Sequence, residues 1–360
     1  MRAMKKTALS LSSRLAAILV IGVAAACGDA ASNGGGPGSS PPNGAVDAAA
    51  DGAIAQTIGP DASSPAMDAA PIGTGSDAAT DAGASDAGMQ AADGGAPPGN
   101  GATPTLPLAT GACPTFVNGT VTFAPAGIPA RSAQVYMSDA AKTKHGPLII
   151  YWYATGSSTG EAQYSLGATL ASIVAAGGIV VAPQADPTAG QFEWFIVNQS
   201  PKLDDFLVAD EIVACAAKST GIDTAHLHSM GMSAGALQTT AMSRLRSSYV
   251  ASVATYSGGL APGFSPPNQD PANKLAAFIF HGGATDNVFN VDFQAASKAY
   301  YASLKADGHF AAICNHGQGH SIPLDAAPSV ALFFEANGFG VTPSPYANGL
   351  PAGFPAYCTL

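Results

Sequence analysis

Two stretches of the sequence have the pattern Gly-x-Ser-x-Gly, in which a serine hydroxyl can act as a nucleophile. The first, GSSTG, covers residues 156–160, and the second, GMSAG, covers residues 231–235. In enzymes built on a parallel sheet, this pattern forms a sharp turn between a strand and a helix. Glycine makes up 42 of the 360 residues, so the pattern alone carries little weight. The neighbouring sequence has to decide between Ser158 and Ser233.

The sequence on both sides of Ser233 favours this serine. The apolar run HLHSMGM, residues 226–232, leads directly into it, and AGALQTTAMSRLR, residues 234–246, has helical spacing. A strand, one sharp turn and a helix are what a nucleophile turn requires. Ser158 follows the apolar run 147–153 only after several loop residues. We therefore predict that Ser233 is the nucleophile and that Ser158 lies in a loop.

The residues next to Ser233 fit a strained turn. Gly231 and Gly235 allow the helix to pass close to the strand, where a side chain would clash. The backbone N–H of Ala234 is then expected to point at the oxyanion that forms during attack by the serine.

An acid and a base follow Ser233 in the order that a catalytic triad on this kind of sheet requires. Asp286 lies in a glycine-rich loop after the apolar run FIFH, and His320 lies in a glycine-bounded loop after AAIC. We predict that Ser233 attacks a carbonyl, that His320 takes and returns the proton, and that Asp286 orients the imidazole.

Three other polar residues near this set have simpler interpretations. His316 is expected to be solvated in its loop. His281 is expected to brace the loop of the acid through hydrogen bonds, and Asp292 to begin a helix.

Strand-like runs and helix-like runs alternate along the chain. This order predicts an α/β fold with a mostly parallel sheet and helices on both faces, so that ligands bind at the carboxyl ends of the strands. The expected strands are residues 119–125, 133–138, 147–153, 179–184, 226–232, 250–258, 275–282 and 310–317. The expected helices are residues 161–178, 204–221, 234–246, 291–308 and 325–338.

The first part of the chain is expected to direct export and to act as a spacer. Residues 1–26 have a basic start, a short apolar run and small residues before Cys27, as in a bacterial lipoprotein signal; an ordinary signal cleavage site is the alternative. Residues 27–110 are rich in Ala, Gly, Asp, Pro and Ser, which predicts a disordered tether. Residues 111–360 form the predicted catalytic domain, either anchored to the cell envelope or secreted, and monomeric.

Cysteines and charges narrow the function further. Besides Cys27 there are four cysteines, Cys113, Cys215, Cys314 and Cys358, an even number that predicts two disulfides in an exported domain but leaves three pairings open. No cysteine spacing indicates a metal site. The net charge is −10, and no basic patch indicates nucleic-acid binding. We expect no cofactor.

The motifs around the predicted triad resemble a known enzyme family. The stretches GIDTAHLHSMGMSAGA (221–236), FIFHGGATDNV (278–288) and GQGH (317–320) are similar to esterases grouped with extracellular poly(3-hydroxybutyrate) depolymerases and feruloyl esterases. The similarity runs from about Gly146 to Gly338. It implies the α/β-hydrolase fold without a large lid domain, and hydrolysis of polymeric or aromatic carboxylic esters through an acyl-enzyme.

One departure from the family concerns the loop after residues 147–153. Family members usually have His-Gly there, whereas this chain has Tyr153-Ala154. By position, the second oxyanion donor is the backbone N–H of Thr155. Tyr153 and Trp194 are candidate substrate-binding residues, although aromatic residues in the loop around Trp194 fit a buried core equally well. The departure keeps one alternative open, a surface binding module that has lost strong catalysis. A serine peptidase on the same fold is a further alternative.

Overall fold

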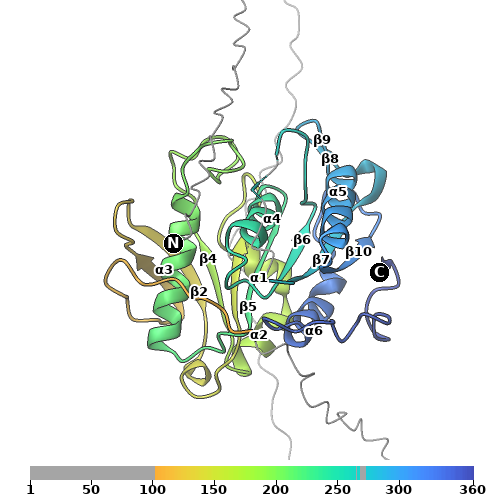
Figure 1. Cartoon of the computed structure of the whole chain (residues 1–360). Coiled ribbons are helices and arrows are strands. Elements are labelled where there is room, and N and C mark those ends of the chain that lie inside the picture. Colours follow the sequence, from red (N-terminus) through yellow and green to blue (C-terminus); the bar gives the residue numbers. More distant parts are fainter. Residues whose placement is uncertain (1–101, 265, 268–272) are drawn as a thin grey trace, which may run out of the picture. The chain divides into compact units, whose positions relative to one another are not determined.

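The long apolar runs form the strands of one mixed sheet, and the segments with helical spacing form the helices that cover it (Figure 1). The computed structural model describes residues 102–264, 266–267 and 273–360. The sheet order is β1-β2-β4-β3-β5-β6-β7-β10-β11. Its strands are β1 Gly119–Phe123, β2 Arg131–Tyr136, β3 Leu148–Trp152, β4 Ile179–Pro183, β5 Leu227–Met232, β6 Ser252–Tyr256, β7 Ala276–His281, β10 Phe310–Asn315 and β11 Cys358–Thr359.

The central strands β4, β3, β5, β6, β7 and β10 are parallel to one another, whereas β2 and β11 pair antiparallel with β4 and β10. Every residue of β3 to β7 is buried, because helices cover both faces of the sheet. The helices are α1 Glu161–Leu166, α2 Ala168–Ala175, α3 Asp204–Ser219, α4 Ala234–Leu245, α5 Phe293–Ala306 and α6 Ala327–Ala336. Helices α1, α2 and α6 contact one another, whereas α4 packs on β5 and β6 and α5 on β7 and β10.

This architecture confirms the predicted α/β-hydrolase fold class, with its mostly parallel sheet. Two details differ from the sequence prediction. The expected helix 161–178 is interrupted at Gly167, whose φ of 49° and ψ of −131° cannot continue a helix. The short strands β8 (Asn287–Val288), β9 (Val291–Asp292) and β11 were not predicted, because two residues carry no alternation pattern. Strands β6 and β7 are joined by residues 257–275, a connection too short for an inserted lid domain.

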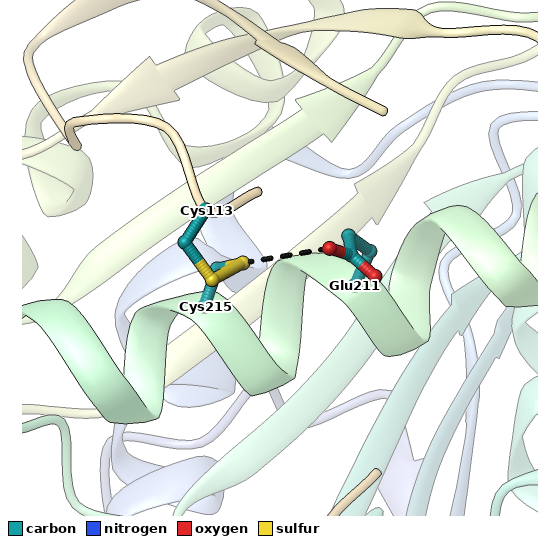
Figure 2. A group of neighbouring side chains, drawn as sticks. All are labelled: Cys113, Glu211 and Cys215. Atoms are coloured by element: carbon teal, nitrogen blue, oxygen red, sulfur yellow. Dashed lines mark hydrogen bonds between the residues drawn. A yellow bond between two sulfur atoms is a disulfide. The ribbon is translucent and has the colours of Figure 1, made fainter. Parts of the chain in front are cut away.

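The four cysteines of the domain form two disulfides, and the structure decides the pairing that the sequence left open. Cys113 pairs with Cys215 on α3, and Cys314 on β10 pairs with Cys358 on β11. Figure 2 shows the first disulfide beside Glu211, whose Oε1 lies 3.7 Å from the Cys215 Sγ. Because these two sulfurs are bonded to each other, this cluster offers no thiolates to a metal ion.

The folded part of the chain begins before Gly111, so the predicted boundary at residue 110 is too late. The Thr105 N–H donates to the Ser248 carbonyl at 2.8 Å. Thr110 donates its N–H and its hydroxyl to the buried Glu211 carboxylate, at 2.8 and 2.9 Å. Burial of that carboxylate requires these donors, which fixes the incoming segment on α3.

The remaining predictions for the N-terminal region concern residues outside the described ranges. The signal over residues 1–26, Cys27 and most of the tether lie outside the described residues. Among the described residues, no helix is both long enough and apolar enough to span a membrane.

Candidate active site

Ser233 occupies a strained turn at the end of β5. Its φ of 55° and ψ of −119° are unusual for a residue with a side chain, and its N–H donates to the Tyr256 carbonyl at 2.9 Å. Helix α4 begins at the next residue, Ala234. The turn thus holds the hydroxyl at the carboxyl edge of the sheet.

The glycines on both sides of Ser233 are required by space. A Cβ at Gly235 would lie 1.9 Å from the carbonyl oxygen of Trp152 on β3, and a Cβ at Gly231 would lie 2.4 Å from the same oxygen. The predicted close approach of helix and strand is therefore confirmed.

His320 and Asp286 meet Ser233 at this edge. His320 Nε2 lies 2.8 Å from Ser233 Oγ, and its Nδ1 lies 2.7 Å from Asp286 Oδ1. The three residues follow the ends of β5, β7 and β10, which lie in the order β5-β6-β7-β10 in the parallel sheet. The fold brings together all three residues that the sequence placed in the triad.

Asp286 is almost fully buried and is held by three donors. Besides His320, the Gly282 N–H and the Ser257 hydroxyl each donate to its Oδ2 at 2.8 Å. Burial by itself raises the pKa of the Asp286 carboxyl, but the hydrogen bonds from His320, Gly282 and Ser257 outweigh burial and hold that pKa below its ordinary value. Asp286 is therefore an anion at neutral pH, suited to orient an imidazole.

Ser257 was missed by the sequence analysis. It follows β6 directly and has a φ of 52°, which turns its hydroxyl toward Asp286. The one available signal was its place after a strand end at the same edge of the sheet.

The interpretations of the neighbouring polar residues His281 and Asp292 are confirmed. His281 Nδ1 accepts the Gly283 N–H at 3.1 Å and so braces the loop of the acid. Asp292 caps α5 by accepting the Ala295 N–H at 2.8 Å. His316 is half-buried rather than freely solvated, and burial lowers the pKa of its imidazole.

The triad opens into a cleft of about 420 Å³. Loop residues 154–157 line it together with Ser233 and His320. Two aromatic side chains at the cleft are strongly exposed, Tyr164 at 61% and Phe289 at 56%. Phe289 lies in the tight turn between β8 and β9 and packs edge-on against Phe192, with ring centroids 5.5 Å apart.

The two predicted oxyanion donors are both available. Ala234 begins α4, and Thr155 lines the cleft. Within the described ranges, neither backbone N–H has a hydrogen-bond acceptor. Two free N–H groups beside a serine hydroxyl are what a developing oxyanion needs.

The predicted substrate contacts of Trp194 and Tyr153 are wrong. Trp194 is fully buried, with its indole N–H donating to the Tyr153 carbonyl at 3.0 Å and its ring packed on Trp152. Tyr153 is 5% exposed, and its hydroxyl accepts the Ala185 N–H at 2.8 Å. Large rings with satisfied polar atoms are core residues, and the same loop instead packs Phe192 against Phe289, which lines the cleft.

Ser158 lies in an exposed loop, as predicted. Its side-chain oxygen accepts a long, 3.4 Å hydrogen bond from the Gly160 N–H, and it is not among the residues that line the cleft of Ser233.

The sheet and the serine turn together define an α/β-hydrolase fold. Solved structures of similar fold support this class. The native pOPH structure is 16% identical, with a TM-score of 0.55 over 68% of this chain and 94% of that chain. The native sOPH structure is 15% identical, with a TM-score of 0.53 over 69% and 96%. No protein-family model and no curated protein matches the chain. At these identities the likeness establishes the fold.

Proposed function

We propose that this protein is a serine carboxylic-ester hydrolase that works through an acyl-enzyme. The observation that carries the proposal is the hydrogen-bonded chain from Asp286 through His320 to Ser233, on a strained turn at the carboxyl edge of the sheet. A buried anion, an imidazole and a hydroxyl in this order form the arrangement that activates a serine nucleophile.

Each group has a definite task in the proposed reaction. Ser233 Oγ attacks the ester carbonyl while His320 Nε2, 2.8 Å away, takes the hydroxyl proton. The N–H groups of Ala234 and Thr155 stabilise the oxyanion. Asp286 stabilises the imidazolium, which then gives its proton to the leaving alcohol. A water molecule, activated by the same imidazole, hydrolyses the acyl-enzyme and restores Ser233.

We further propose polymeric or aromatic esters as substrates. The cleft is open, and the exposed rings of Tyr164 and Phe289 border it. Phe289 occupies a positive φ of 51°, a strained conformation for a bulky residue that keeps its ring at the cleft. Such rings favour an apolar or aromatic segment beside the scissile bond. The resemblance to poly(3-hydroxybutyrate) depolymerases and feruloyl esterases supports the same substrate class.

The two serine pentapeptides offer the test. Ser233→Ala removes the attacking atom, and loss of a triad serine costs up to about 10⁶-fold in kcat. Ser158→Ala is the matched control, expected to cost less than about 10-fold because it removes no oxyanion donor, whose loss costs about 10²–10³-fold. Turnover should be measured on p-nitrophenyl esters, methyl ferulate, polyhydroxybutyrate and a matched amide, with a fluorophosphonate label mapped by mass spectrometry.

The outcomes separate the possible functions. Label on the peptide that contains Ser233, with ester turnover far above amide turnover, supports an esterase. Amide turnover of similar size points to a peptidase. A wild type that takes no label and turns over no ester favours the binding module. Activity that survives Ser233→Ala refutes the assigned nucleophile.

We also propose that the protein is exported as a monomer and is tethered to the cell envelope by a lipid on Cys27. The small residues before Cys27 and the long polar segment after it support this location. Metabolic labelling with a radioactive fatty acid tests it. Wild type should carry label and Cys27→Ser should not, whereas an unlabelled wild type that fractionates as a soluble protein refutes the anchor.

A further inference from the structure

Three consecutive residues of the loop after β3 line the cleft, Ala154, Thr155 and Gly156, and each carries a backbone N–H. The Ala154 N–H donates to the Glu161 carboxylate, at 3.1 Å to Oε1 and 3.3 Å to Oε2. The Gly156 N–H donates to Glu193 Oε1 at 2.9 Å. In this part of the described chain, the N–H between them, of Thr155, has no acceptor. Two carboxylates therefore occupy the flanking donors and leave the middle donor open.

The peptide group that precedes Ala154 is held at both ends. Its carbonyl, from Tyr153, accepts the indole N–H of Trp194 at 3.0 Å, and its N–H is bonded to Glu161. A second bond, from the Ser157 N–H to the Ala154 carbonyl at 3.0 Å, closes the loop on itself. The Thr155 N–H shares its peptide plane with that Ala154 carbonyl, so the two held peptide groups together set the direction of this N–H.

Glu161 is itself fixed by several donors. It is the first residue of α1 and accepts the hydroxyl of Tyr151, a fully buried residue of β3, at 3.0 Å. Burial raises the pKa of the Glu161 carboxyl, and hydrogen bonds from Ser157, Tyr151 and the Ala154 N–H oppose that rise. A half-buried carboxylate with several donors is a rigid anchor rather than a solvated surface charge.

We propose that Glu161 is a positioning residue, which holds the loop so that the Thr155 N–H is the one donor of this loop that points to the oxyanion, with Glu193 holding the opposite side. This assignment rests on the proposed esterase activity. Glu161 touches no reacting atom, so its effect must pass through the loop.

The test is a pair of substitutions at one position. Glu161→Ala removes both acceptor oxygens, so kcat for a p-nitrophenyl ester should fall by about 10²–10³-fold, the cost of a lost oxyanion donor. KM should stay within about threefold, because the oxyanion forms only in the transition state. Glu161→Gln keeps one acceptor oxygen, and we expect its kcat to fall by less than about 10-fold, below the 10²–10³-fold cost of a lost oxyanion donor. Glu335→Ala, at an exposed position of α6, is the matched control and should leave both constants unchanged.

A second measurement tests the oxyanion donors without turnover. An alkylboronic acid that forms a tetrahedral adduct on Ser233 should bind Glu161→Ala at least about 10-fold more weakly than wild type, since it needs the oxyanion donors. Glu161→Ala that keeps wild-type kcat and boronate affinity overturns the proposal. Equal losses in the Gln and Ala variants also overturn it, because a retained acceptor would then have no value. An inactive and unlabelled wild type would instead refute the esterase proposal, and the positioning role of Glu161 would be refuted with it.

Discussion

Replacing Asp286 with asparagine should reverse the tautomer of His320. The Gly282 N–H and the Ser257 hydroxyl both donate to Asp286 Oδ2 at 2.8 Å, and His320 Nδ1 faces Oδ1 at 2.7 Å. Asparagine has one acceptor oxygen, and the Gly282 backbone N–H cannot become an acceptor. The amide oxygen is therefore held at the Oδ2 position, and the amide NH₂ group faces the imidazole.

The reversed tautomer removes the base. Facing an NH₂ group, His320 Nδ1 must accept a hydrogen bond, so the ring proton moves to Nε2, the atom that should take the proton of Ser233. The opposite amide orientation would set NH₂ against the Gly282 N–H and leave a buried donor unpaired, at a cost of about 1–3 kcal/mol. We expect kcat to fall about 10⁴-fold, as for the same change in a serine protease triad. That loss corresponds to about 5 kcal/mol of transition-state stabilisation.

The assay is steady-state hydrolysis of a p-nitrophenyl ester, with thermal unfolding as a measure of folding. Asp292→Asn is the control, because this exposed acid lies six residues further on and only caps α5. Asparagine caps helices about as well as aspartate, so activity and melting temperature should both be retained. Asp286→Asn that stays within about 10-fold of wild type would refute the tautomer argument, since a triad with this geometry loses about 10⁴-fold.

The same substitution should change the stability in acid. The folded pKa of Asp286 lies below its ordinary value, and the unfolded value is about 3.9. The ionised carboxyl therefore contributes stability that is fully present above about pH 4 and is lost as the pH falls through the folded pKa. Acid unfolding monitored by circular dichroism should be less steep in Asp286→Asn, and an unchanged profile would contradict this assignment.

Two further predictions concern the start of the domain and the serine turn. A chain that starts at Ala102 should keep the turnover and melting temperature of the whole protein, whereas a start at Gly111 removes Thr110 from the buried Glu211 carboxylate and should cost about 1–3 kcal/mol in chemical denaturation; equal stability of the two chains would contradict this. Gly235→Ala should cost at least about 1–3 kcal/mol and most of the activity, because its Cβ would lie 1.9 Å from a backbone carbonyl oxygen of β3; an active, stable variant would show that the turn is looser than described.

Local sequence was enough to identify the nucleophile turn and the order of the triad. An apolar run that ends directly at Ser233, with glycines two residues away on both sides, has one local solution, a strained strand-to-helix turn. Alternation of strands and helices then placed the loops of Asp286 and His320 at the same edge. Both inferences depend on neighbouring residues and on chain topology, which a sequence pattern records.

Only the tertiary structure decided which side chains face the cleft and which hold it in place. Trp194 and Phe192 lie in one loop with similar apolar character, yet one is core and the other packs on Phe289 at the cleft mouth. The hydrogen bonds of Glu161 and Glu193 to the oxyanion loop depend on where each carboxylate lies, to within a few tenths of an ångström. Sequence patterns report periodic burial but not the direction of a single loop side chain or its distant partner, because packing against the rest of the chain sets both.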